Sequence, residues 1–172
     1  MTQTGATVSG ERSDLLDSLA KHRYFLRNTV RGLSDEQAGR RTTVSELCLG
    51  GLIKHVAFTE QGWIDFIIRG PSAMEMSPER MKEWSDAFRL LDGETLAGLL
   101  DDYEQVARRT DELVTTLPDL DVSRPLPEAP WFEPGARWSA RRVLLHVIAE
   151  TSQHAGHADI IREALDGAKS MG

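Results

Sequence analysis

The stretch RRVLLHVIAETSQHAGHADIIREALD, residues 141–166, decides the fold because it has the pattern of one long amphipathic helix. Its apolar residues recur at helical spacing, at Val143, Val147, Ala158, Ile161 and Leu165. Glu150 and His154 occupy the same stripe, where two further apolar residues would be expected. Burying a carboxylate and an imidazole without partners is costly, so we expect both side chains to be paired, hydrogen-bonded or bound to a metal ion.

The four-residue spacing of Glu150 and His154 suits a shared metal ion. Residues four apart on a helix differ by roughly 40° around the axis and one turn along it, so both side chains can converge on one ion. His157, three residues after His154, is an alternative third ligand or a hydrogen-bonding partner of the ligands. His146 lies one turn too early to share that ion, and we interpret it as a pocket wall or a partner of a ligand.

A second predicted helix, residues 45–69, also has a polar residue on its apolar stripe. Its inward stripe is Cys48, Leu52, His55, Thr59, Gly62 and Phe66. Alone, His55 would be interpreted as a hydrogen-bonded core histidine. Because the last helix also has polar residues on its buried stripe, His55 becomes a candidate third ligand. Cys48 lies roughly 10 Å away along the axis, too far to share the ion, and is interpreted as a buried thiol.

The helix over residues 45–69 also has recognisable local signals. Ser45 or Thr43 is the expected N-cap, and Gly70 with Pro71 ends the helix. Three glycines weaken its helix propensity, which indicates close packing or room kept for a ligand: Gly50, Gly51 and Gly62.

The remaining chain predicts an all-α domain spanning residues 1–172. Four stretches have the periodicity of long helices: residues 15–30, 45–69, 94–117 and 139–166. Between the second and third lies a long crossover with a short helix, capped by Ser77 and begun by Pro78. Trp84, Phe88 and Leu91 of this crossover are expected to cover the bundle or line a pocket mouth. We therefore predict a four-helix bundle, a fold that commonly holds metal sites between facing helices.

Residues 119–138 hold four prolines and have no periodicity, which predicts an extended loop without strands. A loop of this length in a compact domain is usually functional or disordered. Its aromatic residues Trp131, Phe132 and Trp138 favour an ordered loop and are candidate walls for a bound cofactor or substrate.

Composition excludes several classes of function. The net charge of -7 and a pI near 5.2 argue against nucleic-acid binding, which needs a concentrated basic surface. No apolar run is long enough to cross a membrane, and the N-terminus lacks the order of a signal peptide, so we expect a cytoplasmic protein. The single Cys48 excludes an intrachain disulfide and a multi-cysteine zinc site. Three methionines expected to be exposed are compatible with a homodimer: Met74, Met76 and Met81.

Two motifs resemble a known family. LIKHVAFTE, residues 52–60, and WSARRVLLHVIAETSQHAGHADIIRE, residues 138–163, are similar to the DinB-like superfamily of metal-binding four-helix bundles, and within it to the mycothiol S-transferase branch. The resemblance covers nearly the whole chain and implies that His55, Glu150 and His154 are the metal ligands. Many members have histidine where Glu150 stands, although glutamate is familiar from mycothiol-dependent isomerases. The resemblance thus selects Glu150 with His154, a choice that spacing alone leaves open.

Two imidazoles and one carboxylate leave open positions on a metal ion, which is typical of a catalytic zinc site. Zinc, nickel and iron(II) all suit these ligands, and availability favours zinc. The resemblance implies that mycothiol supplies a thiol, which the metal ionises and directs at a small electrophile in detoxification. His146 and His157 are then the expected catalytic residues, tuning the ligands or moving protons.

Two alternative functions stay open. A mycothiol-dependent isomerase acting on an unsaturated diacid would want cationic residues at the site, for which the candidates are Arg137, Arg141 and Arg142. The other alternative is a non-catalytic bundle with a structural metal and a stress-related role.

Overall fold

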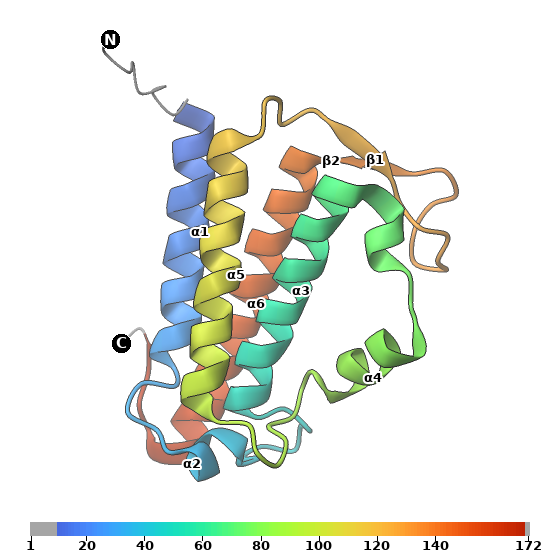
Figure 1. Cartoon of the computed structure of the whole chain (residues 1–172). Helices are drawn as coiled ribbons and strands as arrows, with labels where there is room; N and C mark the ends of the chain where they lie inside the picture. The colour runs from blue at the N-terminus through green and yellow to red at the C-terminus, as the bar shows by residue number, and fades with distance from the viewer. Residues whose placement is uncertain (1–9, 171–172) are drawn as a thin grey trace.

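The computed structural model describes residues 10–170 and has the predicted bundle of four long helices (Figure 1). These helices are α1 (Gly10–Asn28), α3 (Leu49–Arg69), α5 (Leu96–Thr116) and α6 (Ala140–Asp166). Around the bundle, α6 packs between α1 and α3, and α5 packs against the other sides of the same two helices. The mostly helical fold predicted from periodicity is therefore confirmed.

Several helix ends follow the predicted capping chemistry. The hydroxyl of Ser139 accepts a hydrogen bond from the backbone N–H of Arg142 at the start of α6, and Ser77 does the same for Arg80 in α4 (Pro78–Asp86). Gly167 ends α6 with a left-handed φ of 79°, a conformation that favours glycine.

The predicted N-cap of α3 was wrong. Cys48, rather than Ser45 or Thr43, is the N-cap, and its Sγ accepts a hydrogen bond from the backbone N–H of Gly51. The Thr43 and Ser45 hydroxyls instead accept bonds from backbone N–H groups two residues further on. These local bonds hold residues 43–46 in bends and Cys48 is extended, so the helix begins at Leu49.

Three further short elements were missed. The predicted connector after α1 contains helix α2 (Asp35–Gly39), closed by a capping box between Ser34 and Gln37. The predicted loop contains strands β1 (Ser123–Pro125) and β2 (Arg137–Ser139), which pair antiparallel. Each strand is only three residues long, too short to show the alternation that predicts a strand.

The crossover from α3 to α5 lies along the outer side of α3 (Figure 1). It begins with the 3-10 helix η1 (Gly70–Met74), continues through α4 and returns to the bundle before α5. Met76 and Met81 of this segment are exposed as predicted, whereas Met74 is half-buried against the core. Helix α4 has no buried residue and approaches α3 without joining the bundle.

The core consists of two apolar clusters stacked along the bundle. One contains Leu26, Leu52 and Ala155, and the other contains Trp63 and Val147. Along α6, Glu150 and His154 lie between Val147 and Ala155, where the two clusters meet. The polar residues therefore occupy the middle of the bundle, and the apolar packing on both sides fixes the helices that carry them.

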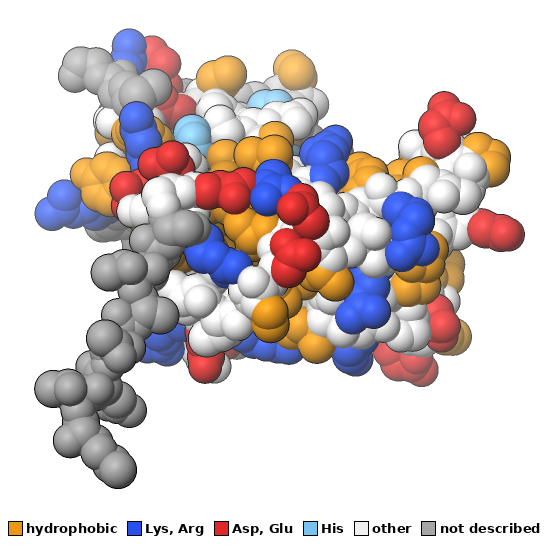
Figure 2. All heavy atoms as spheres, turned by 90° about the horizontal axis from the view of Figure 1, so that it is seen from above, with side chains coloured by type: hydrophobic (Ala, Val, Ile, Leu, Met, Phe, Trp, Pro, Cys, Tyr) orange, Lys and Arg blue, Asp and Glu red, His pale blue; other side chains and the backbone are white. Residues whose placement is uncertain are grey.

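Two further observations concern the distribution of surface charge and the apolar length of the helices. In the view of Figure 2, cationic and anionic side chains are intermixed on the visible face. No helix within residues 10–170 is long and apolar enough to span a membrane.

Candidate metal centre

The structure brings His55 of α3 together with Glu150 and His154 of α6. Each side chain offers one ligand atom, and these atoms lie within 4.8 Å of one another. His55 and His154 are 8% and 9% exposed, and Glu150 is half-buried. His154 Nε2 lies 3.5 Å from Glu150 Oε2. Two facing helices thus place two imidazoles and one carboxylate around a common point.

The protonation of these groups suits metal binding. Burial, together with a smaller effect of the nearby His154, lowers the pKa of His55 to about 4 against the opposing effect of Glu150. His55 is therefore neutral at pH 7, and within the described chain its buried Nδ1 has no hydrogen-bond partner. The hydrogen bond from His154 lowers the pKa of Glu150 despite partial burial, so Glu150 is ionised. This donor set fits a divalent ion such as Zn²⁺.

The two other predicted histidines contact the candidate ligands but lie outside the cluster of three. His157 Nδ1 lies 3.4 Å from His154 Nδ1, on the imidazole nitrogen that does not face Glu150. His146 Nε2 lies 3.7 Å from Glu150 Oε1, and burial lowers the pKa of His146. Each is placed to orient a ligand through its second polar atom.

The crossover covers the centre with an aromatic ring. Phe88 stacks on His55 with ring centroids 3.8 Å apart, and its ring also lies 6.1 Å from His154. Phe88 reaches this position because its backbone passes Gly51, where a Cβ would lie 2.0 Å from the Phe88 carbonyl oxygen. Cys48 is buried, as predicted, and its thiol donates to the same carbonyl at 3.7 Å.

A second aromatic group adjoins the centre on the His146 side. Trp138 stacks on Trp63 with centroids 4.8 Å apart, and both rings meet His146 edge-on at about 5 Å. Phe132 packs against Trp138, whereas Trp131 contacts Phe132 and is 77% exposed. Sequence reasoning missed Trp63. Its position two turns beyond His55 on the same helix was the available signal.

A cavity of about 410 Å³ lies beside these rings, between α3, the crossover and the loop before β2. Its walls are mostly apolar and include Phe58, Trp63 and Phe132. Of the three cations expected at the site for an isomerase, two have partners away from it, whereas Arg142 lies close enough for its charge to help lower the pKa of His146. Arg141 forms ion pairs with Glu11 and Asp121. Arg137 donates a hydrogen bond to Ser123, and the Arg142 guanidinium lies over the Trp138 ring.

Sequence reasoning also missed a buried ion pair in the middle of the bundle. Glu60 of α3 is 1% exposed and accepts hydrogen bonds from Arg23 of α1 and from Thr110 of α5, the latter at 2.6 Å. Burial would lower the pKa of Arg23, but Glu60 and Asp111 raise it, so the guanidinium stays charged. This network ties three helices together and supports the helix that carries His55.

Comparison with known proteins identifies a family and a solved structure of similar fold. Residues 14–167 match the sequence model of the family described as mycothiol-S-transferase. The crystal structure of a conserved protein from Enterococcus faecalis has a similar fold, with a TM-score of 0.64 and 14% identity, covering 91% of this chain and 97% of that chain. No curated protein sequence is similar enough to be matched to this chain. Since the family match spans most of the bundle, including both helices that carry the candidate ligands, the chain belongs to the mycothiol S-transferase family.

Proposed function

We propose that this protein conjugates the thiol of mycothiol to small electrophiles in a zinc-dependent detoxification reaction. The observation that carries the proposal is the convergence of His55, Glu150 and His154 within 4.8 Å, in a chain of the mycothiol S-transferase family. Three protein ligands leave positions open for a thiol.

Each residue of the centre has its own role in the proposed reaction. His55, Glu150 and His154 would hold the ion, which when bound supplies the positive charge that lowers the pKa of a coordinated thiol. His157 orients the ring of His154 through the Nδ1 contact. His146, held by Trp63 and Trp138, accepts the thiol proton at Nε2, and the sulfur then forms a bond to the electrophilic carbon as the leaving group departs.

The aromatic rings near β2 supply a surface for the sugar part of mycothiol. Phe132 and Trp138 form a continuous edge with Trp63 and His146, and Trp131 extends it toward solvent. Aromatic faces bind apolar sugar faces without needing charge, which agrees with a neutral, hydroxyl-rich thiol.

The test is a conjugation assay with purified protein, mycothiol and 1-chloro-2,4-dinitrobenzene. We expect a rate above the uncatalysed reaction that is lost with a chelator and restored by Zn²⁺. His154→Ala should abolish this rate, whereas His22→Ala, a substitution on α1 outside the centre, should keep it. Absence of metal-dependent conjugation across several electrophiles would overturn the proposal.

A further inference from the structure

The cavity beside the metal centre has one feature that its apolar walls do not explain. Arg80 of α4 lines it together with Phe58 and Gly62 of α3. The Arg80 guanidinium lies over the ring of Phe58, with its central carbon 5.3 Å from the ring centroid. A Cβ on Gly62 would lie 2.9 Å from Arg80 Nη2, so the missing side chain at Gly62 leaves the space that the guanidinium fills.

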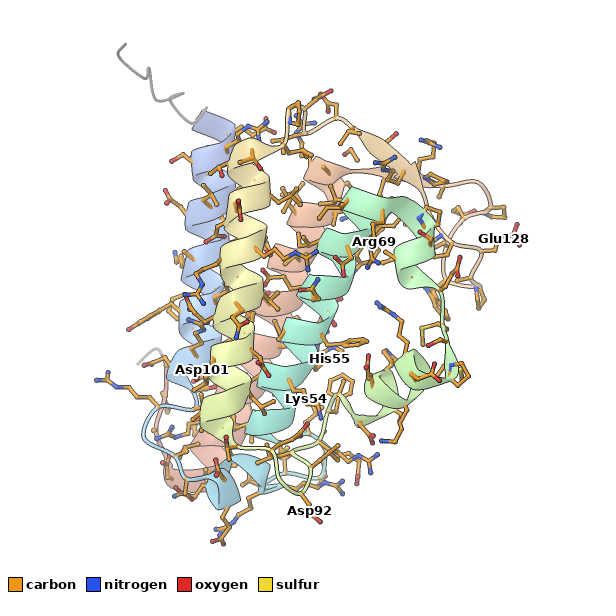
Figure 3. All side chains as sticks on the ribbon, in the orientation of Figure 1. Lys54, His55, Arg69, Asp92, Asp101 and Glu128 are labelled. Carbon is orange, nitrogen blue, oxygen red and sulfur yellow. The ribbon has the colours of Figure 1, made fainter. Side chains whose placement is uncertain are left out.

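The charge of Arg80 has no carboxylate partner within residues 10–170. Its contacts are the Phe58 ring and the backbone bond to the Ser77 cap. The carboxylate that lines the cavity, Glu128, lies at the outer end of its loop (Figure 3). The neighbouring cations Lys82 and Arg89, by contrast, both pair with Asp86.

Residues of the cavity wall relate Arg80 to the metal centre. Thr59 and Gly62, on the cavity wall, follow His55 by four and seven residues, which is about 6 to 10 Å along the helix. Trp84, also on the wall, precedes Phe88 by one turn. The wall also contains Trp63, whose ring meets His146 at 4.9 Å, so one side of the cavity adjoins the centre while Arg80 lines it as well.

We propose that this cavity is the subsite for the electrophile, and that Arg80 selects electrophiles carrying a carboxylate on a flat apolar body. The proposal rests on the proposed function, because it assumes that the reacting carbon lies at the metal centre. Arg80 offers two parallel N–H donors to the carboxylate, and the rings on the α3–α4 side of the cavity, Phe58 and Trp84, stack on the body, which leaves the loop rings to the sugar. In a protein with a net charge of -7, such a substrate needs a local cation.

The test measures binding without any thiol, so its result does not depend on transferase activity. Metal-loaded protein is titrated calorimetrically with 3,5-dinitrobenzoate and with its neutral counterpart, 3,5-dinitrobenzamide. We expect the carboxylate to bind at least tenfold more tightly than the amide. Arg80→Gln should reduce this ratio to below about twofold, and Lys82→Gln, which removes the same charge elsewhere on α4, should leave it unchanged.

Gly62→Ala provides a second variant, which keeps the charge of Arg80 but shifts its guanidinium. Because the new Cβ displaces Arg80 Nη2, we expect the preference to fall here too. Equal binding of the two probes to the wild type, or no binding of either, would overturn the proposal. A preference that survives Arg80→Gln would also overturn it, since the carboxylate would then bind to the metal ion. If the protein prefers the carboxylate probe but catalyses no conjugation, only the proposed transferase activity would be overturned.

Discussion

The ring of Phe88 lies 3.8 Å from that of His55, centroid to centroid, and only 21° from parallel to it. The two residues belong to segments 33 positions apart, and their stack joins the crossover to the bundle. The close passage of the Phe88 backbone over Gly51 fixes this relationship. The candidate metal ligand His55 is thereby shielded on one face by a segment that lies outside the four-helix core.

Gly51→Ala should separate the crossover from α3. A Cβ at this position would lie 2.0 Å from the Phe88 carbonyl oxygen and 2.3 Å from its carbonyl carbon, so the backbone must move. We expect the free energy of unfolding to fall by about 1–3 kcal/mol in urea denaturation, with weaker zinc binding. In Gly156→Ala nothing lies within 4 Å of the new Cβ, and stability should rise by up to about 1 kcal/mol. Equal stability of Gly51→Ala and wild type would contradict the packing described.

Glu60→Gln should destabilise the bundle strongly. The substitution leaves the buried guanidinium of Arg23 with only the half-exposed Asp111 as a carboxylate partner. We expect a loss of about 3 kcal/mol in the free energy of unfolding, because an uncompensated buried charge is costly. Asp102→Asn, on the exposed face of α5, should change it little. If both variants were equally stable, the buried pair would not contribute as inferred.

The Lys54–Glu94 pair predicts a pH-dependent contribution to stability. Burial raises the pKa of Glu94, but hydrogen bonds from Lys54 and the Leu91 N–H outweigh it and lower this pKa below its usual value. The contribution is thus present above the unfolded-state pKa and disappears as the pH falls through the folded-state pKa. In metal-free protein, Glu94→Gln should cost below about 1 kcal/mol at pH 7 and less at pH 3. A deficit of the same size at both pH values would refute this.

His157→Ala distinguishes an orienting residue from a ligand. His157 contacts the Nδ1 of His154, away from Glu150. We expect the variant to bind one zinc ion per chain with an affinity about 10–100-fold lower, the usual cost of losing a partner that orients a ligand. Competition with a chromogenic chelator measures both quantities. Loss of the stoichiometric site would instead assign His157 as a ligand.

The sequence predicted those features that depend on local periodicity and capping. The apolar stripes of α3 and α6 specified the helices, and they also showed His55, Glu150 and His154 as polar residues on buried faces. The resemblance to the family then selected this set from the possible histidine pairs.

What the sequence could not show depends on contacts between distant segments. Glu60 has the pattern of an ordinary helix-surface residue until Arg23, 37 residues earlier, is placed against it. Arg80 likewise belongs to a polar crossover helix, and only the approach of α4 to Gly62 gives it a place in the cavity. The strands β1 and β2 depend on pairing with each other, since neither has a pattern of its own.

The most direct test of the central claim is the zinc content of purified protein, measured by elemental analysis. We expect one ion per chain in the wild type and in His22→Ala, and little or none in His55→Ala and His154→Ala, with all variants checked for helical content. Full metal content in both His55→Ala and His154→Ala would contradict the assignment of the centre.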